Sequence, residues 1–295
     1  MATLLTPRQV ALAIGASESS LKRWCDKGTL PVVRTAGGHR RLAVDQVLEF
    51  LRQTGQPLVR PELLGLPSAT GQGAFVIDRA AGQLAAALLA GDEEQCQRIV
   101  LDLFLAKHRL AEIFDRVIAA AFVQIGQAWE CGEAQVYEER RGCEIALRLL
   151  HRLRAMLPAA GPAAPRALGG TLSGDHYQLP TAMVELVLRD LGWAAQSLGT
   201  SLPRDTWLAA LEAEKPQLLW LSVSHLPDEP QFLADYAAIQ AAAMERGVPV
   251  VVGGYALAPE VRSRMQYAAY GDQLRHLVGF VQALRSEPAK PDLAK

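Results

Sequence analysis

The sequence predicts a multidomain chain with a winged helix-turn-helix domain, then a four-helix bundle, then an α/β domain with a doubly wound parallel sheet. The chain has 295 residues, which is more than one compact domain usually holds. Two segments rich in proline and glycine interrupt it, and segments of this composition are typical of linkers. The hydrophobic pattern is purely helical between the two segments and alternates between strands and helices after the second. The expected boundaries are 1–58 for the first domain, 59–75 for a linker, 76–158 for the bundle, 159–166 for a second linker, 167–286 for the sheet domain and 287–295 for a frayed tail.

Composition excludes several classes of protein. Half of the residues are hydrophobic and 21% are charged, which is typical of globular chains and not of disordered or fibrous ones. No apolar run approaches the roughly 20 residues of a membrane span, and the N-terminus has no long apolar signal core. We therefore expect a cytoplasmic protein with no membrane partner. The cysteines form no C-x-x-C pair, so we expect reduced thiols and no zinc site; they are Cys25, Cys96, Cys131 and Cys143.

Charge is distributed unevenly along the chain. The net charge is −1, yet residues 1–60 carry nine lysines and arginines against four acids, a balance of +5 that leaves −6 for the remainder. A basic module on an acidic body is typical of a nucleic-acid-binding protein whose other domains serve another purpose.

The elements of the first domain follow from local signals. Thr6-Pro7 predicts a helix start and Gly15 its end, and Ser17 predicts the N-cap of a second helix that ends at Asp26. Two short helices joined by a tight turn are a helix-turn-helix signature. Residues 31–42 predict a strand, a Gly-Gly turn and a basic strand, which together form a wing, and residues 44–51 predict a third helix. The expected DNA contacts are Ser19, Lys22, Arg23, Arg34, Gly37, Gly38, His39, Arg40 and Arg41.

Residues 76–157 predict four helices, at about 78–90, 93–106, 109–130 and 134–157, which is the length of a four-helix bundle. Gly132 places Trp129 at the end of one helix and Glu139 in the first turns of the next. Both side chains could therefore project from one end of the bundle. Taken alone, they are better explained as a packing residue and a surface acid.

In the third domain, short apolar runs at 168–172, 194–198, 218–223, 248–252 and 266–270 alternate with helical stretches. This alternation predicts a parallel sheet that binds any ligand at the carboxyl ends of its strands. Three segments lie where strands end, and they carry the candidate ligand-site residues Asp175, His176, Tyr177, Ser222, Gly253 and Gly254.

These motifs support a family resemblance. Leu21-Lys22-Arg23-Trp24 and Thr35-Ala36-Gly37-Gly38-His39-Arg40-Arg41 resemble the DNA-binding domain of MerR-family regulators and their excisionase-like relatives, and the match covers nearly all of 5–56. The bundle and sheet together resemble the cobalamin-binding module of methionine synthase. Over residues 5–286, the chain resembles the cobalamin-dependent light-sensing repressors of the MerR family.

The resemblance implies a corrinoid site with specific departures. In that family a Trp and, ten positions on, Glu-His cover the upper face of the cofactor; Trp129 and Glu139 match, whereas Arg140 stands in place of the His. Glu130 stands where light-sensing members have a second His, so we expect no light-driven switching between two histidine ligands.

The lower side of the site departs further. Asp175, Ser222 and the Gly253-Gly254 pair match the family pattern, but Tyr177 occupies the position of the cobalt-binding His, and a neutral phenol is a poor cobalt ligand. His176 is one residue out of register. The resemblance implies that the cofactor's nucleotide tail enters beside Ser222 and the glycine pair, although Pro180 replaces a small motif glycine there.

We therefore expect a sequence-specific DNA-binding regulator, acting as a repressor and controlled through a cobalamin-binding-like sensor module, and not an enzyme. The alternatives are a cofactor-free regulator or antirepressor that uses the module for protein interaction, and a corrinoid carrier for methyl transfer. The cofactor is cobalamin, another tetrapyrrole-like ligand, or none, with no protein-bound metal. The expected partners are double-stranded operator DNA, further copies of the chain in a homodimer or homotetramer, and a regulatory protein.

Overall fold

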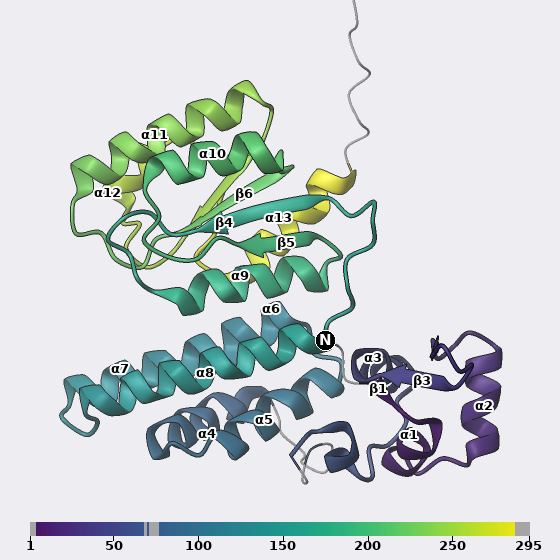
Figure 1. Ribbon diagram of the computed structural model, residues 1–295. Coiled ribbons are helices and arrows are strands. Elements are labelled where there is room, and N and C mark those ends of the chain that lie inside the picture. Colours follow the sequence, from purple (N-terminus) through teal and green to yellow (C-terminus); the bar gives the residue numbers. More distant parts are fainter. Residues whose placement is uncertain (1–3, 68–69, 71–76, 287–295) are drawn as a thin grey trace, which may run out of the picture. The chain divides into compact units, whose positions relative to one another are not determined.

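The computed structural model describes residues 4–67, 70 and 77–286 of the chain. The chain divides into two compact units, Met1–Ala159 and Ala160–Lys295, coloured purple to teal and green to yellow in Figure 1. The expected frayed tail, 287–295, and residues 68–69 and 71–76 of the first linker lie outside the described residues.

The first unit begins with the predicted helix-turn-helix. Helix α1 (Pro7–Ala13) starts at Thr6, whose side chain accepts a hydrogen bond from the backbone N–H of Gln9. Helix α2 (Glu18–Asp26) starts at Ser17, which caps it in the same way. The third helix, α3, spans Val44–Thr54. The predicted helices therefore form, and a side-chain cap begins each of the first two.

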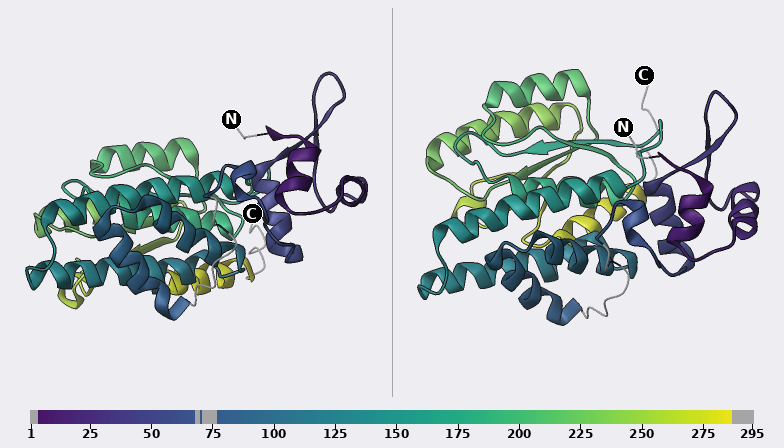
Figure 2. Two further views of the ribbon diagram at one scale, coloured as in Figure 1. Left: turned by 90° about the horizontal axis from the view of Figure 1, so that it is seen from below. Right: turned by 60° about the horizontal axis from the view of Figure 1, so that its bottom comes forward.

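The predicted wing is also present. Strands β2 (Val33–Arg34) and β3 (Arg40–Ala43) pair in antiparallel fashion, and the loop between them projects away from the helices of its unit (Figure 2). A further strand, β1 (Leu4–Leu5), pairs with the other edge of β3. Two residues are too few to show strand periodicity, so the sequence could not predict β1.

Part of the segment expected as the first linker packs against the helix-turn-helix. The short 3-10 helix η1 (Pro61–Leu64) contacts α1, and the backbone N–H groups of Val59 and Arg60 both donate to the carbonyl of Ala13. Leucine side chains are buried along this stretch, at Leu58, Leu64 and Leu66. The prolines and glycines of this stretch therefore belong to an ordered segment that runs back along α1.

The remainder of the first unit is the predicted set of four helices. The third of them is one continuous helical stretch with three parts, because its hydrogen bonding changes to the π pattern in the middle. The buried side chains of these helices form the bundle core. The elements are α4 (Ile77–Ala90), α5 (Glu93–Leu105), α6 (Leu110–Ile113), η2 (Phe114–Ala119), α7 (Ala120–Glu130) and α8 (Val136–Met156).

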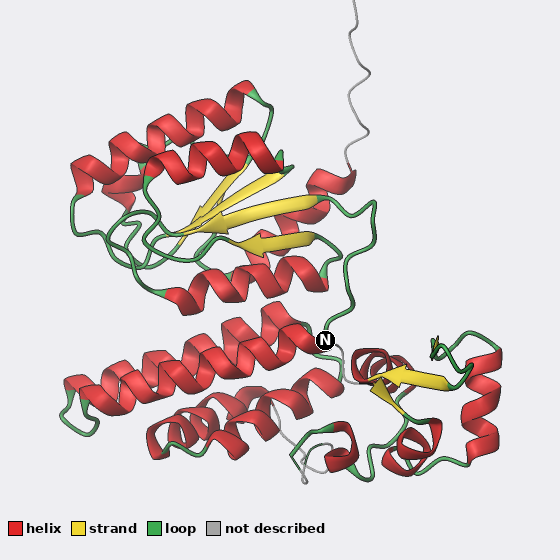
Figure 3. Ribbon diagram, viewed as in Figure 1, coloured by secondary structure: helices red, strands yellow, loops and turns green. Residues whose placement is uncertain are grey.

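The second unit is the predicted parallel sheet with helices on both faces (Figure 3). Its strand order is β5-β4-β6-β7-β8, and every neighbouring pair is parallel. The strands are β4 (Arg166–Gly170), β5 (Ala194–Ser197), β6 (Leu218–Ser222), β7 (Val250–Gly253) and β8 (Ala269–Tyr270). The helices are α9 (Gln178–Asp190), α10 (Arg204–Glu214), α11 (Glu229–Glu245), α12 (Pro259–Arg262) and α13 (Leu274–Ser286).

Each face of the sheet has its own core. Trp207 and Tyr236 bury one face beneath α10 and α11, while Trp193, Trp220 and Val281 bury the other beneath α9 and α13. The chain runs from β4 outward to β5 and then returns to the other side of β4 to form β6. This reversal of strand order lies between β4 and β6, where doubly wound sheets bind ligands at the carboxyl edge.

Candidate DNA-binding surface and candidate ligand site

Helix α2 presents its polar side chains to solvent. Ser19, Lys22 and Arg23 are exposed, whereas Leu21 is fully buried. The ring of Trp24 lies 4.9 Å from that of Phe50 on α3. Leu21 and Trp24 therefore anchor the helix to the rest of the domain. Lys22 and Arg23 lie on its exposed side, which is the side that would face a DNA groove.

The wing is shaped by its own hydrogen bonds. The N–H of Thr35 donates to the carbonyl of His39 across the turn, and the N–H of Gly38 donates to the carbonyl of Thr35. Gly38 has φ +77°, a left-handed conformation that favours glycine. The turn is therefore tight, and the side chains of Arg34 and His39 are exposed beside it.

An ion pair joins the wing to α2. The Arg40 guanidinium donates to Asp26 Oδ1 at 2.7 Å, and both side chains are partly exposed. Arg41 turns its guanidinium back toward the carbonyl of Arg40, at 3.0 Å. The sequence pattern predicted Arg40 and Arg41 as DNA contacts. It did not predict the pairing of Arg40 with Asp26, because only the fold places Asp26 opposite the wing. A hollow of about 450 Å³ lies between α1, α2 and the wing, lined by Pro7, Glu18, Ser19, Lys22, Cys25 and Arg40.

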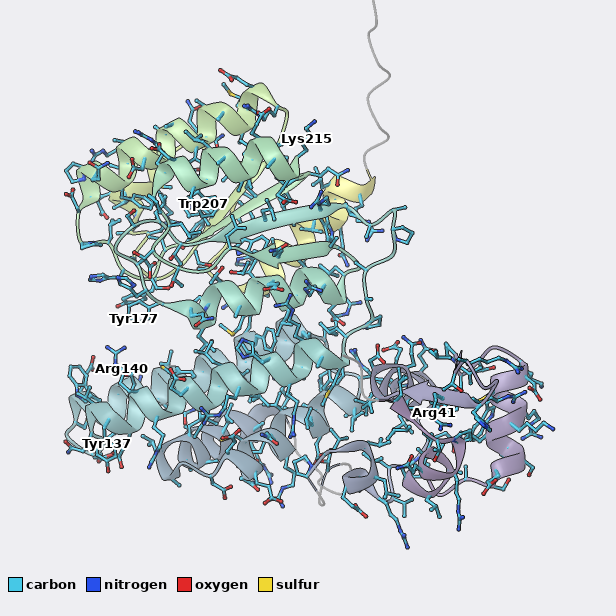
Figure 4. All side chains as sticks on the ribbon, viewed as in Figure 1. Arg41, Tyr137, Arg140, Tyr177, Trp207 and Lys215 are labelled. Atoms are coloured by element: carbon cyan, nitrogen blue, oxygen red, sulfur yellow. The ribbon has the colours of Figure 1, made fainter. Side chains whose placement is uncertain are left out.

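One end of the bundle carries the predicted Trp and Glu. Trp129 is 53% exposed in the last turn of α7, and Glu139 lies in the first turn of α8. Glu139 already has two partners: the Arg140 guanidinium at 3.7 Å and the Cys143 thiol, which donates to its Oε1 at 3.4 Å. Arg140 is largely exposed near the start of α8 (Figure 4). This end therefore offers an uncovered indole beside charged groups.

In the sheet unit, Asp175 holds two loops together. Its side chain is 3% exposed. One carboxylate oxygen accepts the N–H of Tyr177 at 3.0 Å, and the other accepts the N–H groups of Ser224 and His225 at 2.6 and 3.2 Å. Its backbone carbonyl also accepts the N–H of Ser201. The carboxylate thus binds backbone amides of the β4–α9 and β6–α11 loops, and no imidazole.

Tyr177 and His225 consequently lie side by side. Their ring centroids are 6.4 Å apart, and Tyr177 is 46% exposed at the N-cap of α9, near the ends of the strands in Figure 4. His176 is exposed as well. The edge therefore presents a phenol and two imidazoles from two loops. No three His, Cys, Asp or Glu side chains gather as a metal site within the part of the chain that the structure describes.

The residues expected to admit a nucleotide tail are closely packed. Ser222 and Gly253 are paired across β6 and β7. A Cβ on Gly253 would overlap the carbonyl oxygen of Gly271, and one on Gly254 would overlap the backbone of Val223. Both glycines therefore permit backbone segments to approach each other. They line no open cradle, so the fit to an inserted tail is poor at this point.

Trp220 is the large residue at this edge, and it was not among the residues predicted for the site. It is 2% exposed, and its Nε1–H donates to Thr181 Oγ1 at 3.0 Å. The Thr181 and Ser197 hydroxyls lie 3.3 Å apart. A Cβ on Gly169 would overlap the indole, so the ring lies across β4. The available signal was a Trp two positions before Ser222 and therefore on the same face of the strand.

Comparison with known proteins defines the class of each part. Residues 4–55 match a helix-turn-helix domain, and residues 80–154 and 165–274 each match a B12 binding domain. The chain therefore joins a helix-turn-helix to the helical and sheet parts of a B12-binding module. Among the described residues, no helix combines the length and apolarity that a bilayer crossing requires.

Two proteins of Myxococcus xanthus are similar in sequence. The HTH-type transcriptional repressor CarA is 30% identical over 151 residues, covering 50% of each chain. The HTH-type transcriptional repressor CarH is 29% identical over 162 residues, covering 53% of this chain and 52% of its own. The chain thus spans about half the length of these relatives. The monomethylamine corrinoid protein of Methanosarcina barkeri shares the fold, with a TM-score of 0.57 at 14% identity, covering 69% of this chain and 96% of its own.

Proposed function

We propose that the protein is a sequence-specific DNA-binding repressor whose C-terminal domains sense a corrinoid or another tetrapyrrole. The observation that carries the proposal is the basic surface of α2 and the wing, joined by the Arg40–Asp26 ion pair, in one chain with the two parts of a B12-binding module. The pattern of residues further favours the MerR family and assembly into dimers or tetramers, since one short recognition helix reads only a few base pairs.

In this proposal, α2 enters the major groove and the wing follows a neighbouring phosphate strand. Lys22 and Arg23 supply the helix contacts, while Arg34 and His39 flank a turn whose glycines let the backbone approach a phosphate. Ser19 provides a neutral hydrogen-bonding group on the same helix. Arg40 is held toward α2 by Asp26, so it sets the position of the wing in addition to contributing charge.

Each of the two units offers exposed aromatic or imidazole groups to a planar ligand. Trp129 would stack on one face of a planar macrocycle. Tyr177, His176 and His225 would contact a macrocycle at the sheet edge, where a bound metallotetrapyrrole would offer a metal to these donors. Asp175 positions Tyr177 and His225 through their backbone amides.

A titration tests the ligand. The full-length protein is mixed in the dark with adenosylcobalamin or hydroxocobalamin, and haemin is tested separately; each mixture is then run on a sizing column. Co-elution of the chromophore is the expected result. Trp129→Ala should weaken that binding about fivefold, since stacking on one aromatic ring is worth on the order of 1 kcal/mol. Retention of wild-type affinity by the variant would remove Trp129 from the site.

A selection experiment tests the DNA function. Random duplex DNA is selected on the full-length protein, and the recovered sequences are compared with those retained by the Lys22→Ala, Arg23→Ala double variant. Enrichment of a symmetric motif by the wild type alone supports the proposal. Recovery of unenriched sequence by both proteins would contradict sequence-specific binding.

A second candidate is a regulator or antirepressor that binds no cofactor and uses the module to contact another regulatory protein. Tyr177 at the expected ligand position favours it. Absence of chromophore with all three tetrapyrroles, together with intact DNA binding, would select this alternative. A corrinoid carrier is a weaker candidate, because Asp175 is engaged by backbone amides and orients no imidazole.

A further inference from the structure

We infer that Trp220 fills the space that the nucleotide base of a cobalamin would occupy, so that the sheet domain binds tetrapyrroles without taking in a nucleotide tail. The inference deepens the proposed function, because it rests on the ligand-binding role of the sheet domain and names the class of ligand. The evidence for it is the packing of the Trp220 side chain of β6 against β4 and α9.

A nucleotide tail that enters beside Ser222 must lie on the same face of the sheet as the Ser222 side chain. Successive residues of a strand point to opposite faces, so Ser222 points to the same face as Trp220, and Gly253 to the same face as Val251. Trp220 and Val251 both belong to the core beneath α9 and α13. A group that enters beside Ser222 and Gly253 on this face therefore meets the space beneath α9.

A hydrogen-bonded side chain already fills this space. The indole of Trp220 lies across Gly169 and is fixed by the bond from its Nε1 to Thr181 in the first turn of α9. Pro180, at the position of the expected small motif residue, precedes Thr181. On the other side, the backbone of Gly271 lies against Gly253.

The indole and the base of the nucleotide tail are also alike in shape. Indole and benzimidazole are both flat bicyclic aromatics of nearly the same size, with an N–H or nitrogen on the five-membered ring. A benzimidazole inserted between β4 and α9 would take the place of the indole. The close packing of a protein interior leaves no room for both rings.

The test uses the full-length protein, 5,6-dimethylbenzimidazole as the small probe, and hydroxocobalamin and aquacobinamide as the corrinoids with and without the nucleotide. Trp220→Ala opens the space, and Trp220→Leu opens it partly in case the first variant unfolds. Trp207→Ala is the matched control, because Trp207 is equally buried but lies in the core of the opposite face. Circular dichroism checks that each variant is folded.

Wild-type protein should bind the two corrinoids with affinities within about threefold of each other, and dimethylbenzimidazole should leave its Tm unchanged. Trp220→Ala or Trp220→Leu should show a rise in Tm with dimethylbenzimidazole and a preference of about tenfold for hydroxocobalamin over aquacobinamide. Trp207→Ala should not acquire the preference for hydroxocobalamin, because its cavity lies on the opposite face of the sheet.

Two results would overturn the inference: a preference of about tenfold or more for hydroxocobalamin in the wild type, or folded Trp220 variants with no response to dimethylbenzimidazole. If the wild type binds neither corrinoid, a corrinoid is eliminated as its ligand. The response of the Trp220 variants to dimethylbenzimidazole still decides the inference in that case, so the two failures are distinguishable.

Discussion

The side chain of Arg40 has two roles in the basic surface. Its guanidinium is 2.7 Å from Asp26, so it ties the wing to α2, and it adds positive charge where a phosphate strand would pass. Surface ion pairs of this kind contribute about 1 kcal/mol or less to stability. The main consequence of the pair is therefore expected in DNA affinity.

We expect Arg40→Ala and Arg41→Ala each to weaken binding to all DNA sequences and to lower the salt slope, by about one unit for each phosphate that the variant leaves unneutralised. Asp26→Asn should raise the salt slope, because it removes a negative charge and frees Arg40 for a phosphate. The measurement is DNA affinity as a function of salt concentration. Arg264→Ala is the control, since that arginine pairs with Glu229 in the sheet unit. An unchanged affinity and slope in both wing variants would refute the phosphate contacts.

The cysteines differ in reactivity for physical reasons. Burial, helped by the Glu139 carboxylate, raises the pKa of the Cys143 thiol to about 12. Burial also raises the pKa of Cys96 to about 12. Thiolates are the reactive form, so neither group is suited to redox sensing near neutral pH. All four cysteines are free thiols, and Cys131 is exposed.

Alkylation with iodoacetamide at pH 8 should therefore modify Cys131 first and leave Cys143 and Cys96 unmodified in the folded protein. With a pKa of about 12, about one Cys143 in ten thousand is a thiolate at that pH. The alkylation rate of Cys143 should rise about tenfold per pH unit up to pH 10, because the fraction of thiolate rises by the same factor. Mass spectrometry of the peptides measures the order in which the cysteines are alkylated. Early modification of Cys143 in folded protein would contradict its burial.

At the scale of elements, β4, β6 and α9 depend on one another through Gly169 and Trp220. The indole lies against the Cα of Gly169 and reaches Thr181 of α9. A methyl group at position 169 has no space, because the neighbour is a ring held by a buried hydrogen bond. The glycine is thus required by packing and not by backbone conformation.

Gly169→Ala should destabilise the sheet unit by about 1–3 kcal/mol, the usual cost of overpacking. The Gly169→Ala, Trp220→Leu double variant should lose less than the sum of its single changes, because the smaller side chain makes room for the methyl group. Urea unfolding measures the free energies. Gly279→Ala in α13 is the control: a Cβ there meets nothing within 4 Å, so this variant should be unchanged or slightly more stable. If the losses in the free energy of unfolding of the two single variants simply add in the double variant, the Trp220 ring does not limit the space at position 169.

Elements with strong local signals could be predicted from the sequence. The Gly37-Gly38 turn, the Ser17 cap and the alternation of short apolar runs predicted the wing, α2 and the parallel sheet. The return of the chain along α1 could not be predicted, because proline and glycine are typical both of linkers and of ordered turns. The filled space at the sheet edge was hidden too: Leu218–Ser222 is a fully buried strand. The spacing places Trp220 on the face of Ser222, but a continuous apolar run does not reveal which helices cover that face.

At the scale of the whole molecule, the division into two units places the helix-turn-helix together with the bundle. The basic residues and the helix-turn-helix lie in the same compact unit as the bundle, Met1–Ala159. Helix α3 packs against α5 and α8, and Arg52 of α3 lies over the ring of Phe104 at 4.3 Å while donating to the carbonyl of His108. The DNA-binding helices and the bundle therefore share a packed boundary, through which a change in the bundle can reach α3.

This arrangement predicts that residues 1–159 fold without the sheet unit and carry the DNA-binding surface. On a single half-site, the fragment should bind with the same salt slope per bound protomer as the full chain, to within about one counterion, because every expected phosphate contact lies in residues 19–41. Thermal unfolding followed by circular dichroism checks its fold, and a sizing column compares its oligomeric state with that of the full chain. An Arg52→Ala variant of the fragment should bind DNA equally well yet unfold at a lower temperature, since the change removes the interactions with Phe104 and His108 but no basic residue of the DNA surface. A folded fragment with a markedly smaller salt slope would place DNA contacts in the sheet unit instead.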